Sequence, residues 1–144
     1  MIGIGPKFPL ALDSVDGAYL LIKELKEEVK QNFKNLLLTI PGERVMDPEF
    51  GIGIERFLFE NNTIELRSAI DTRIKQQVRK YLPFIQVRNL IVSPEEDPMR
   101  MDPNSLFVEI KYFIAPIATE DILNITLPYS TVSEEGSSQS SFQY

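Results

Sequence analysis

The side chains of this sequence with the clearest capacity for chemistry are a group of carboxylates near the middle of the chain. Glu43, Asp47, Glu49, Glu55 and Glu60 lie close enough in sequence to supply a pair. Two carboxylates at a defined separation, one of them with a raised pKa, can hydrolyse a glycosidic bond. Carboxylates in a protein with 25% charged residues are usually solvated, so glycoside hydrolysis is the weaker alternative.

The residue types that are missing exclude several other kinds of chemistry. The sequence contains no Cys and no His, which removes disulfide frameworks, thiol nucleophiles, thiolate metal sites and Ser-His-Asp catalysis. The formal net charge of -6 disfavours a nucleic-acid partner, because binding to phosphates needs a basic face. Gly51 and Gly53 do not form a dinucleotide-binding motif, since Arg56 stands where the third glycine belongs. We therefore expect no cofactor and no nucleic acid.

An acidic stretch in the second half of the chain is the main candidate for a metal site. Its carboxylates could gather a hard cation such as calcium, but the ligand spacing and the glycine of an EF-hand are missing. The residues concerned are Glu95, Glu96, Asp97 and Asp102. A solvated acidic loop is the favoured interpretation, so we predict no metal site.

An amphipathic helix is predicted before the carboxylate group. Asp13 or Ser14 can serve as its N-cap, and apolar residues then recur at spacings of three and four. The pattern predicts one buried stripe along the helix as far as Leu36. The stripe consists of Val15, Ala18, Ile22, Leu25, Val29, Phe33 and Leu36.

A second amphipathic helix is predicted to begin after Asn62 or Thr63 and to run to Tyr81 or Leu82, where Pro83 stops it. Its five basic and two acidic residues make it basic within an acidic protein. Two explanations remain open, compensation of the helix dipole at its C-terminal end and an adaptor surface for acidic partners. The adaptor surface would consist of Arg67, Arg73, Lys75 and Arg79.

Three strands are predicted over residues 84–92, 106–114 and 121–127, because these segments are rich in β-branched and aromatic residues or alternate in polarity. Together with the helices they indicate an α+β fold. We expect two amphipathic helices packed on a small, mainly antiparallel three-stranded sheet.

The organisation of the chain is predicted from composition. Residues 1–12 are apolar but interrupted by glycines and prolines, which favours an extended N-terminal arm. Residues 13–128 form the α+β domain, and the Ser-rich segment 129–144 is expected to be a disordered tail. No apolar run approaches the roughly 18 residues of a membrane span, and the N-terminus does not resemble a signal peptide. We expect no membrane partner and synthesis in the cytoplasm.

The segment between the predicted helices carries the most unusual pattern of the sequence. A Thr is followed by a Gly-Glu-Arg triplet, then by Pro, a Phe-Gly pair and another Gly. The positions are Thr39, Gly42, Glu43, Arg44, Pro48, Phe50, Gly51 and Gly53. Turn residues at this density, with glycines that permit positive φ, indicate a loop with an interaction role.

This pattern resembles the signature of the small baseplate wedge proteins of contractile phage tails, to which a type VI secretion baseplate subunit is related. The resemblance extends over residues 13–128 and implies a fold similar to the conserved domain of the sheath protein. It also implies a structural subunit of the virion tail baseplate that contacts larger wedge subunits and starts the sheath. Tail tube and hub proteins are further partners to expect.

The resemblance assigns partner contacts to the motif, at Glu43, Arg44, Pro48, Phe50 and Gly51. A salt bridge between Glu43 and Arg44 that fixes the turn is the alternative, and the two roles are compatible. Some relatives carry a tail-lysozyme name, which makes a peptidoglycan-degrading enzyme with a carboxylate pair the alternative function. No Glu of this chain is followed nine positions later by Asp, as phage-type lysozymes require. We therefore predict no enzyme.

The edge of the predicted sheet is the second expected partner site. Sheath subunits are linked by exchanged strands, so the resemblance implies that an initiator offers a strand acceptor. The strand 121–127 is the candidate edge, with Asp121, Asn124 and Thr126 as partner-binding residues. Because the order of the strands is open, the edge could instead be residues 84–92.

Overall fold

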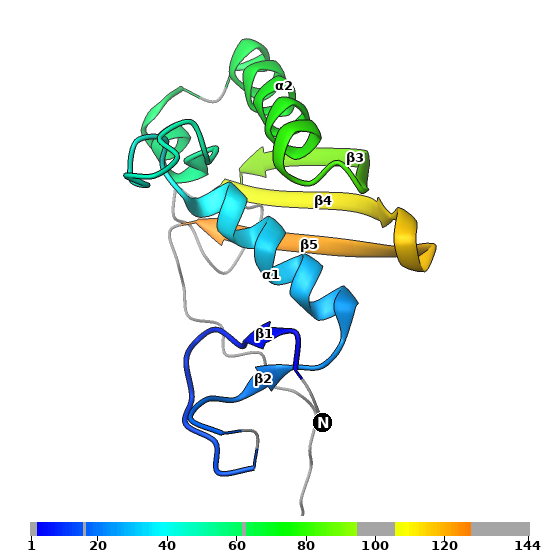
Figure 1. Cartoon of the computed structure of the whole chain (residues 1–144). Coiled ribbons are helices and arrows are strands. Elements are labelled where there is room, and N and C mark those ends of the chain that lie inside the picture. The colour runs from blue at the N-terminus through cyan, green and yellow to red at the C-terminus, as the bar shows by residue number, and fades with distance from the viewer. Residues whose placement is uncertain (1–2, 16, 62, 95–105, 128–144) are drawn as a thin grey trace, which may run out of the picture.

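The computed structural model describes residues 3–15, 17–61, 63–94 and 106–127 (Figure 1). Two helices and a three-stranded sheet form an α+β domain, and a small two-stranded hairpin precedes it. The elements are β1 (Gly5–Pro6), β2 (Leu21–Ile22), α1 (Leu25–Leu38), a short 3-10 helix (Ile54–Phe59), α2 (Ile64–Tyr81), β3 (Ile85–Pro94), β4 (Leu106–Ile114), a 3-10 turn (Ala115–Ile117) and β5 (Thr119–Leu127).

The sheet is antiparallel throughout, and β4 is its central strand. The β4–β5 pair runs without a register shift from Leu106, opposite Leu127, to Ile114, opposite Thr119. Every second side chain of β4 is buried, as the alternation of its sequence predicts. The pairing of β3 with β4 is interrupted by a bulge between Val87 and Asn89.

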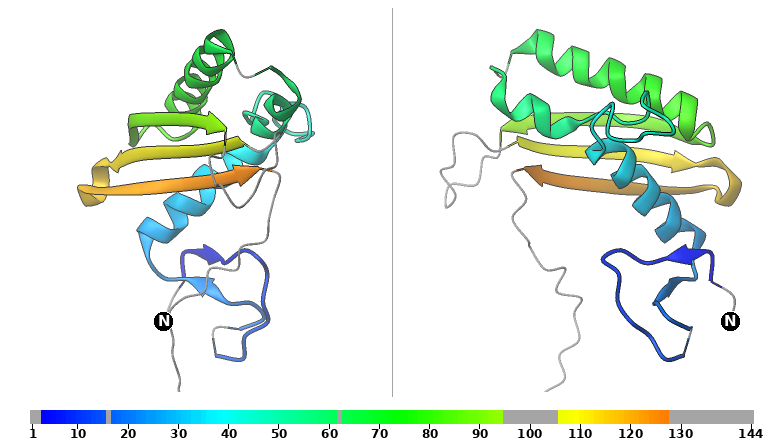
Figure 2. Two further views of the ribbon diagram at one scale, coloured as in Figure 1. Left: turned by 180° about the vertical axis from the view of Figure 1, so that it is seen from behind. Right: turned by 60° about the vertical axis from the view of Figure 1, so that its left-hand side comes forward.

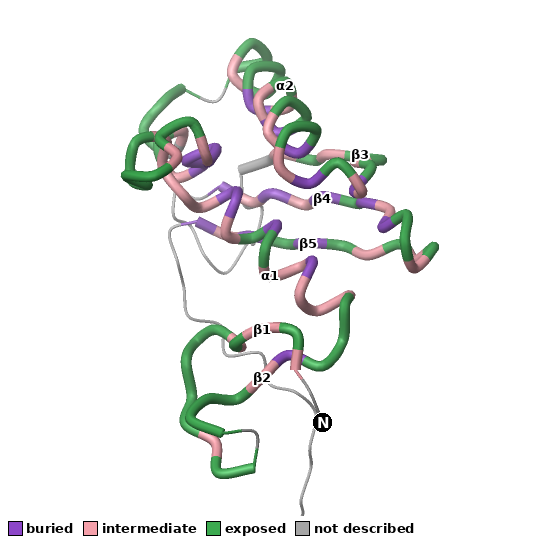
Figure 3. The backbone as a smooth tube through the Cα atoms, viewed as in Figure 1, coloured by how far each residue is buried: buried purple, intermediate pink, exposed green. Residues whose placement is uncertain are grey.

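Both helices cover the same face of the sheet, and the core lies between them and the strands (Figures 1 and 2). Phe33 of α1 packs edge to face on Tyr112 of β4, with 5.1 Å between the ring centres. Figure 3 shows the buried residues gathered on the inner sides of these elements. The opposite face of the sheet carries no helix among the described residues, as Figure 2 shows from behind.

The second helix and the strands confirm the sequence-based expectation. Thr63 is the N-cap of α2, and its hydroxyl accepts a hydrogen bond of 3.2 Å from the Leu66 N–H. The helix ends at Tyr81, next to its C-cap Leu82. The strands are β3, which extends to Pro94, β4 with the expected bounds, and β5, which begins two residues early at Thr119.

The predicted start of the first helix is wrong, because α1 begins at Leu25 rather than near Ser14. Gly17 has a φ of +120°, which a helix cannot contain. The preceding backbone instead forms a hairpin, in which the N–H of Ile4 donates to the C=O of Ile22 at 2.8 Å. Val15, placed on the buried stripe by its spacing, is 85% exposed.

We call residues 3–24 the N-terminal hairpin. It contains the described part of the predicted arm of residues 1–12, and the boundary of that arm stays a prediction. The candidate cation loop with Glu95, Glu96, Asp97 and Asp102 lies outside the described residues, as does the predicted tail of residues 129–144. Neither helix in the described part of the chain combines the length and apolar character needed to cross a membrane.

Candidate functional site

The loop that joins α1 to the short 3-10 helix contains the unusual sequence pattern, and we call residues 39–53 the motif loop. Its turn is closed by backbone hydrogen bonds from Gly42 N–H to Pro48 C=O (2.8 Å) and from Glu43 N–H to Ile40 C=O (3.1 Å). The Glu43 carboxylate accepts the Ile40 N–H at 3.0 Å. Glu43 therefore holds its own turn, with a backbone donor as the partner of its carboxylate.

Gly51 lies where the motif loop returns to the end of α1. Its φ is +112°, and a Cβ at this position would lie 2.2 Å from the carbonyl oxygen of Thr39. The next residue, Ile52, donates its N–H to the C=O of Leu36 at 3.0 Å. The close approach of two backbone segments, together with the positive φ, requires glycine here.

The side chain of Gln77 fixes the motif loop on α2. Its Nε2 donates to the C=O of Glu49 at 3.1 Å, and its Oε1 accepts the Gly51 N–H at the same distance. An amide has both a donor and an acceptor, so one side chain replaces two backbone partners. Tyr81 adds a hydrogen bond of 3.0 Å from its hydroxyl to Asp47.

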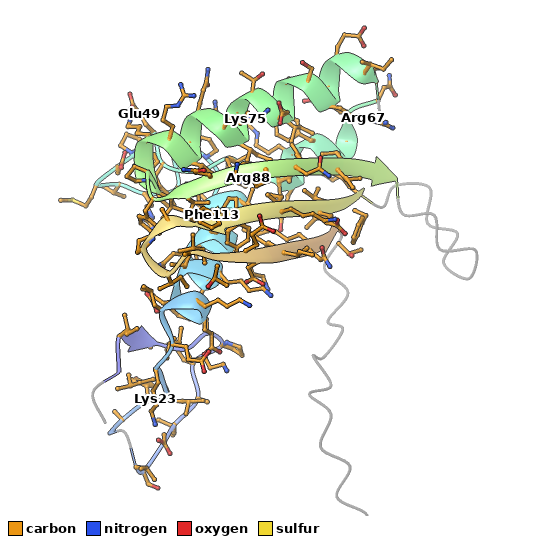
Figure 4. All side chains as sticks on the ribbon, turned by 90° about the vertical axis from the view of Figure 1, so that its right-hand side faces the viewer. Lys23, Glu49, Arg67, Lys75, Arg88 and Phe113 are labelled. Atoms are coloured by element: carbon orange, nitrogen blue, oxygen red, sulfur yellow. The ribbon has the colours of Figure 1, made fainter. Side chains whose placement is uncertain are left out.

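Most of the basic residues of α2 have acidic or carbonyl partners within the protein. Lys80 pairs with Glu49, and this hydrogen bond raises the pKa of Lys80 above its usual value. Lys75 pairs with Asp71 at 2.7 Å, and Arg73 reaches the C=O of Gly51 at 3.5 Å. Figure 4 shows Glu49 and Arg67 at opposite ends of this helix. Most of the positive charges on α2 are thus paired within the protein. This weakens the alternative that α2 is an adaptor surface for acidic partners.

Arg44 and Phe50, both predicted partner-binding residues, contact each other. The Arg44 guanidinium lies 3.8 Å from the centre of the Phe50 ring, a cation–π contact. Phe50 in turn packs edge to face on Tyr81, with 4.9 Å between the ring centres. Among the described residues Glu43 and Arg44 make separate contacts, so the alternative of a salt bridge between them does not hold there.

The tip of the motif loop exposes two apolar side chains that sequence reasoning missed. Val45 is 94% and Met46 is 96% exposed, and Pro48 is exposed beside them. Exposed apolar side chains on a fixed loop are typical of a protein–protein contact. The sequence did contain a signal for this surface. The Val-Met pair lies in a turn-rich segment, outside any helix or strand that would bury it.

The two edges of the sheet differ. On β3, Arg88 is the extra residue of the bulge and stacks on Phe113 of β4 (5.4 Å), and α2 packs beside this strand (Figure 4). A bulge is a common means of protecting an edge against strand addition. On the other side, β5 is regular over its whole length and pairs only with β4 among the described residues.

The three predicted partner residues of β5 have different environments. Asn124 is exposed and Thr126 half-buried on the sheet face without helices, where both can meet a partner. Asp121 points to the other face, where it accepts the Tyr112 hydroxyl at 3.0 Å and lies 3.4 Å from Lys26. Burial raises the pKa of the Tyr112 hydroxyl above its usual range, and the charge of Asp121 adds to the effect. Asp121 therefore holds α1 against the sheet.

Four of the five carboxylates considered for hydrolysis have separate environments, and the fifth, Glu55, is half-buried on the short 3-10 helix. Glu43 and Asp47 accept hydrogen bonds from within the loop and from Tyr81, Glu49 pairs with Lys80, and Glu60 is exposed. Within the described ranges, no group of three or more acidic side chains is placed to hold a metal ion. The positive features of the site are the exposed apolar tip of the motif loop and the regular edge of β5, and both are surfaces that can contact another protein.

Comparison with known proteins agrees with this interpretation. The profile of the family described as baseplate wedge protein gp25 matches residues 23–116. The chain is 31% identical over 86 residues to the baseplate wedge protein gp25 of Enterobacteria phage T4. The alignment covers 60% of this chain and 61% of the T4 protein, so the chain spans about three-fifths of that relative.

Solved structures share the fold. A chain of the anti-feeding prophage baseplate aligns with a TM-score of 0.65 and 29% identity, over 76% of this chain and 83% of the other. A Geobacter sulfurreducens protein described as a tail lysozyme aligns with a TM-score of 0.62 over 74% and 93% of the two chains, and its 24% identity shows the fold alone. Since the family profile covers well over half of the sequence, the chain belongs to the baseplate wedge protein gp25 family.

Proposed function

We propose that this protein is a wedge subunit of a contractile-tail baseplate and that it starts the tail sheath by accepting an extended segment of a sheath subunit at the free edge of β5. The observation that supports the proposal most strongly is the contrast between the two edges. β3 carries a bulge and has α2 beside it, whereas β5 runs nine residues in regular register and has β4 as its strand partner within the described residues.

A strand added to β5 gains main-chain hydrogen bonds, each contributing roughly 0.5–1.5 kcal/mol net. Side chains of the incoming strand would alternate between the two faces of the sheet. On the face without helices they would meet Asn124, Thr126 and Ile122, which is 43% exposed. Ile122 thus gives the added strand a partly apolar neighbour.

The motif loop is proposed to bind the larger wedge subunits. Its tip presents Val45 and Met46, while the contacts of Gln77 and Tyr81 hold the loop in one conformation. A loop that is already ordered loses little conformational freedom on binding. Met46→Asp should leave the isolated domain folded and reduce its incorporation into wedges, whereas normal incorporation of this variant would argue against the loop as a wedge contact.

A non-catalytic role is part of the proposal. A glycosidase acid needs an apolar environment. Glu43 and Glu60 are exposed, and Glu49 is exposed and paired with Lys80. The purified chain should release no soluble fragments from peptidoglycan. Release that depends on one of these carboxylates would instead support the lysozyme alternative.

Proline substitution in β5 tests the strand-acceptor role. In an antiparallel strand, neighbouring residues direct their N–H groups to opposite sides, so either Ile125 or Thr126 directs its N–H to the free edge. Proline at that residue removes a donor for the incoming strand and leaves the β4–β5 ladder intact. Circular dichroism and thermal melting identify the variant that keeps the fold.

The folded proline variant should fail to support sheath polymerisation, measured as the fraction of sheathed tails in electron micrographs. Gln86→Ala is the matched control, because it changes an exposed side chain of β3, away from the β5 edge, and keeps every N–H group. If baseplates with the folded proline variant polymerise sheath as well as the control, the role of β5 is refuted.

A further inference from the structure

The N-terminal hairpin carries an unusual amount of exposed apolar surface. Seven of the fourteen large hydrophobic side chains that are exposed in the described part of the chain belong to it. They are Ile4, Phe8, Leu10, Leu12, Val15, Tyr19 and Leu20. Leu12 and Val15 are each 85% exposed, and Figure 3 shows most residues of the hairpin in the colour of exposed residues. A surface of this kind on a soluble domain marks a binding site.

Polar contacts with α1 hold the hairpin in place. Gln31 accepts the Phe8 N–H at 2.9 Å and donates to the C=O of Pro6 at 3.1 Å. Lys7 pairs with Glu27 at 2.6 Å. Ile22 is the one fully buried residue among those described in the hairpin, and it lies outside the main core cluster. Leu12 and Val15, the two most exposed of these side chains, therefore contribute little to the attachment of the hairpin to the domain.

The hairpin lies on the β5 side of the sheet, away from α2 and β3, in all the views of Figures 1 and 2. The first turns of α1 connect it with the free edge. Glu27 binds the hairpin through Lys7, and the adjacent Lys26 lies 3.4 Å from Asp121 at the start of β5. A strand added to β5 would run on the same side of the domain as the hairpin.

We propose, on the basis of the sheath docking proposed above, that the N-terminal hairpin is a second docking surface for the same sheath subunit. Its occupant is an uncharged, apolar patch next to the segment that pairs with β5. Position favours this occupant, because the hairpin lies on the same side of the sheet as β5, the strand proposed to receive the segment. The lack of charge also favours an uncharged occupant, since residues 8–12 are all exposed and contain no ionisable side chain.

Two linked contacts give the interface more affinity than either alone, since the second contact forms within the complex. The profile of the gp25 family matches residues 23–116 and so omits nearly the whole hairpin. The proposed strand acceptor β5, Thr119–Leu127, also lies beyond the matched residues, so both proposed sheath contacts lie outside the part covered by the family profile. In this proposal the hairpin and β5 are two separate surfaces that together select the sheath subunit of this tail.

The experiment compares binding of two probes to the full chain. The first is the purified sheath subunit, and the second is a synthetic peptide with the sequence of its extended terminal segment. Leu12→Asp combined with Val15→Asp alters the hairpin, and Leu12→Ser with Val15→Ser does so without adding charge. Ile64→Asp, at an 81% exposed residue of α2, is the matched control. Thermal melting confirms that each variant is folded.

Both hairpin variants should bind the sheath subunit at least tenfold more weakly than the wild type and bind the peptide with unchanged affinity. The control should bind both probes like the wild type. Wild-type affinity of the hairpin variants for the sheath subunit would overturn the hairpin proposal. In that case, if the folded β5 proline variant binds neither probe, the proposal that β5 accepts a strand is still supported.

Sedimentation of the chain alone tests the competing occupant, a second copy. The wild type should remain monomeric at the concentrations used for binding. Dimers that are abolished by Leu12→Ser with Val15→Ser would assign the hairpin to self-association and overturn the proposal.

Discussion

Replacement of Gly51 by alanine tests how the motif loop is built. The φ of +112° places a non-glycine residue in a strained region that costs about 1–3 kcal/mol. The new Cβ would also lie 2.2 Å from the Thr39 oxygen and 2.8 Å from its carbonyl carbon, distances at which the backbone must move. Movement weakens the hydrogen bond from Gly51 to Gln77, worth roughly 0.5–1.5 kcal/mol.

The sum of these effects predicts that Gly51→Ala lowers the free energy of unfolding by about 2–4 kcal/mol. For a chain of this size, each kcal/mol shifts the melting temperature by roughly 2–4 °C. Urea titration followed by circular dichroism measures the free energy, provided that the slope with denaturant is unchanged.

Gly42→Ala is the matched control, because Gly42 also has a positive φ, +96°, but nothing lies within 4 Å of the position that a Cβ would take there. This variant has the backbone strain without the collision, so its free energy of unfolding should fall by about 1–2 kcal/mol. The difference between the two variants measures the close approach of Gly51 to the end of α1. Equal losses, or a neutral Gly51→Ala, would refute the explanation given for this glycine.

Two further predictions concern side chains that hold the domain together. Gln77→Ala should lower the free energy of unfolding by about 1–3 kcal/mol in urea titration, because Glu49 C=O and Gly51 N–H lose their partner; an unchanged value would mean that water replaces the amide. Unfolded Tyr112 ionises near pH 10, while the folded state, with its raised pKa, keeps the proton. Stability should therefore fall above pH 10 by up to about 1.4 kcal/mol per pH unit, and Tyr112→Phe should remove that slope, measured against the wild type.

The strands and α2 could be predicted from sequence because their signals are local. β4 alternates buried and exposed residues over nine positions, and this period of two has no competing explanation. α2 has both a capping residue, Thr63, and a stop at Pro83. Each element was thus specified by residues within it or next to it.

The first helix shows where local signals mislead. Val15, Ala18 and Ile22 have helical spacing, but their segment pairs with residues near the N-terminus. The presence of Gly17 between them was the available warning, since its φ of +120° is incompatible with a helix. Long-range pairing overrode a periodic pattern that had no strong helix propensity behind it.

The motif loop could be recognised from the sequence, but the side chains that hold it in place could not. Gly51 could be identified because glycine reports a backbone requirement at its own position. The roles of Gln77 and Tyr81 could not be identified, since these residues lie 26 and 34 positions from their partners Gly51 and Asp47. A polar residue on a helix has the same local appearance whether it faces solvent or fixes a distant backbone segment.

The asymmetry of the sheet gives the proposed assembly its direction. With two equivalent edges, a three-stranded sheet would accept strands on both sides and could join copies of itself into longer sheets. Here the bulge at Arg88 and the packing of α2 disfavour addition at β3, so addition at β5 is the remaining route. The motif loop is fixed on α2, at the β3 side, and the hairpin lies at the β5 side. Wedge and sheath contacts would then occupy opposite sides of one small domain, which lets the sheath start on a subunit already held in the baseplate.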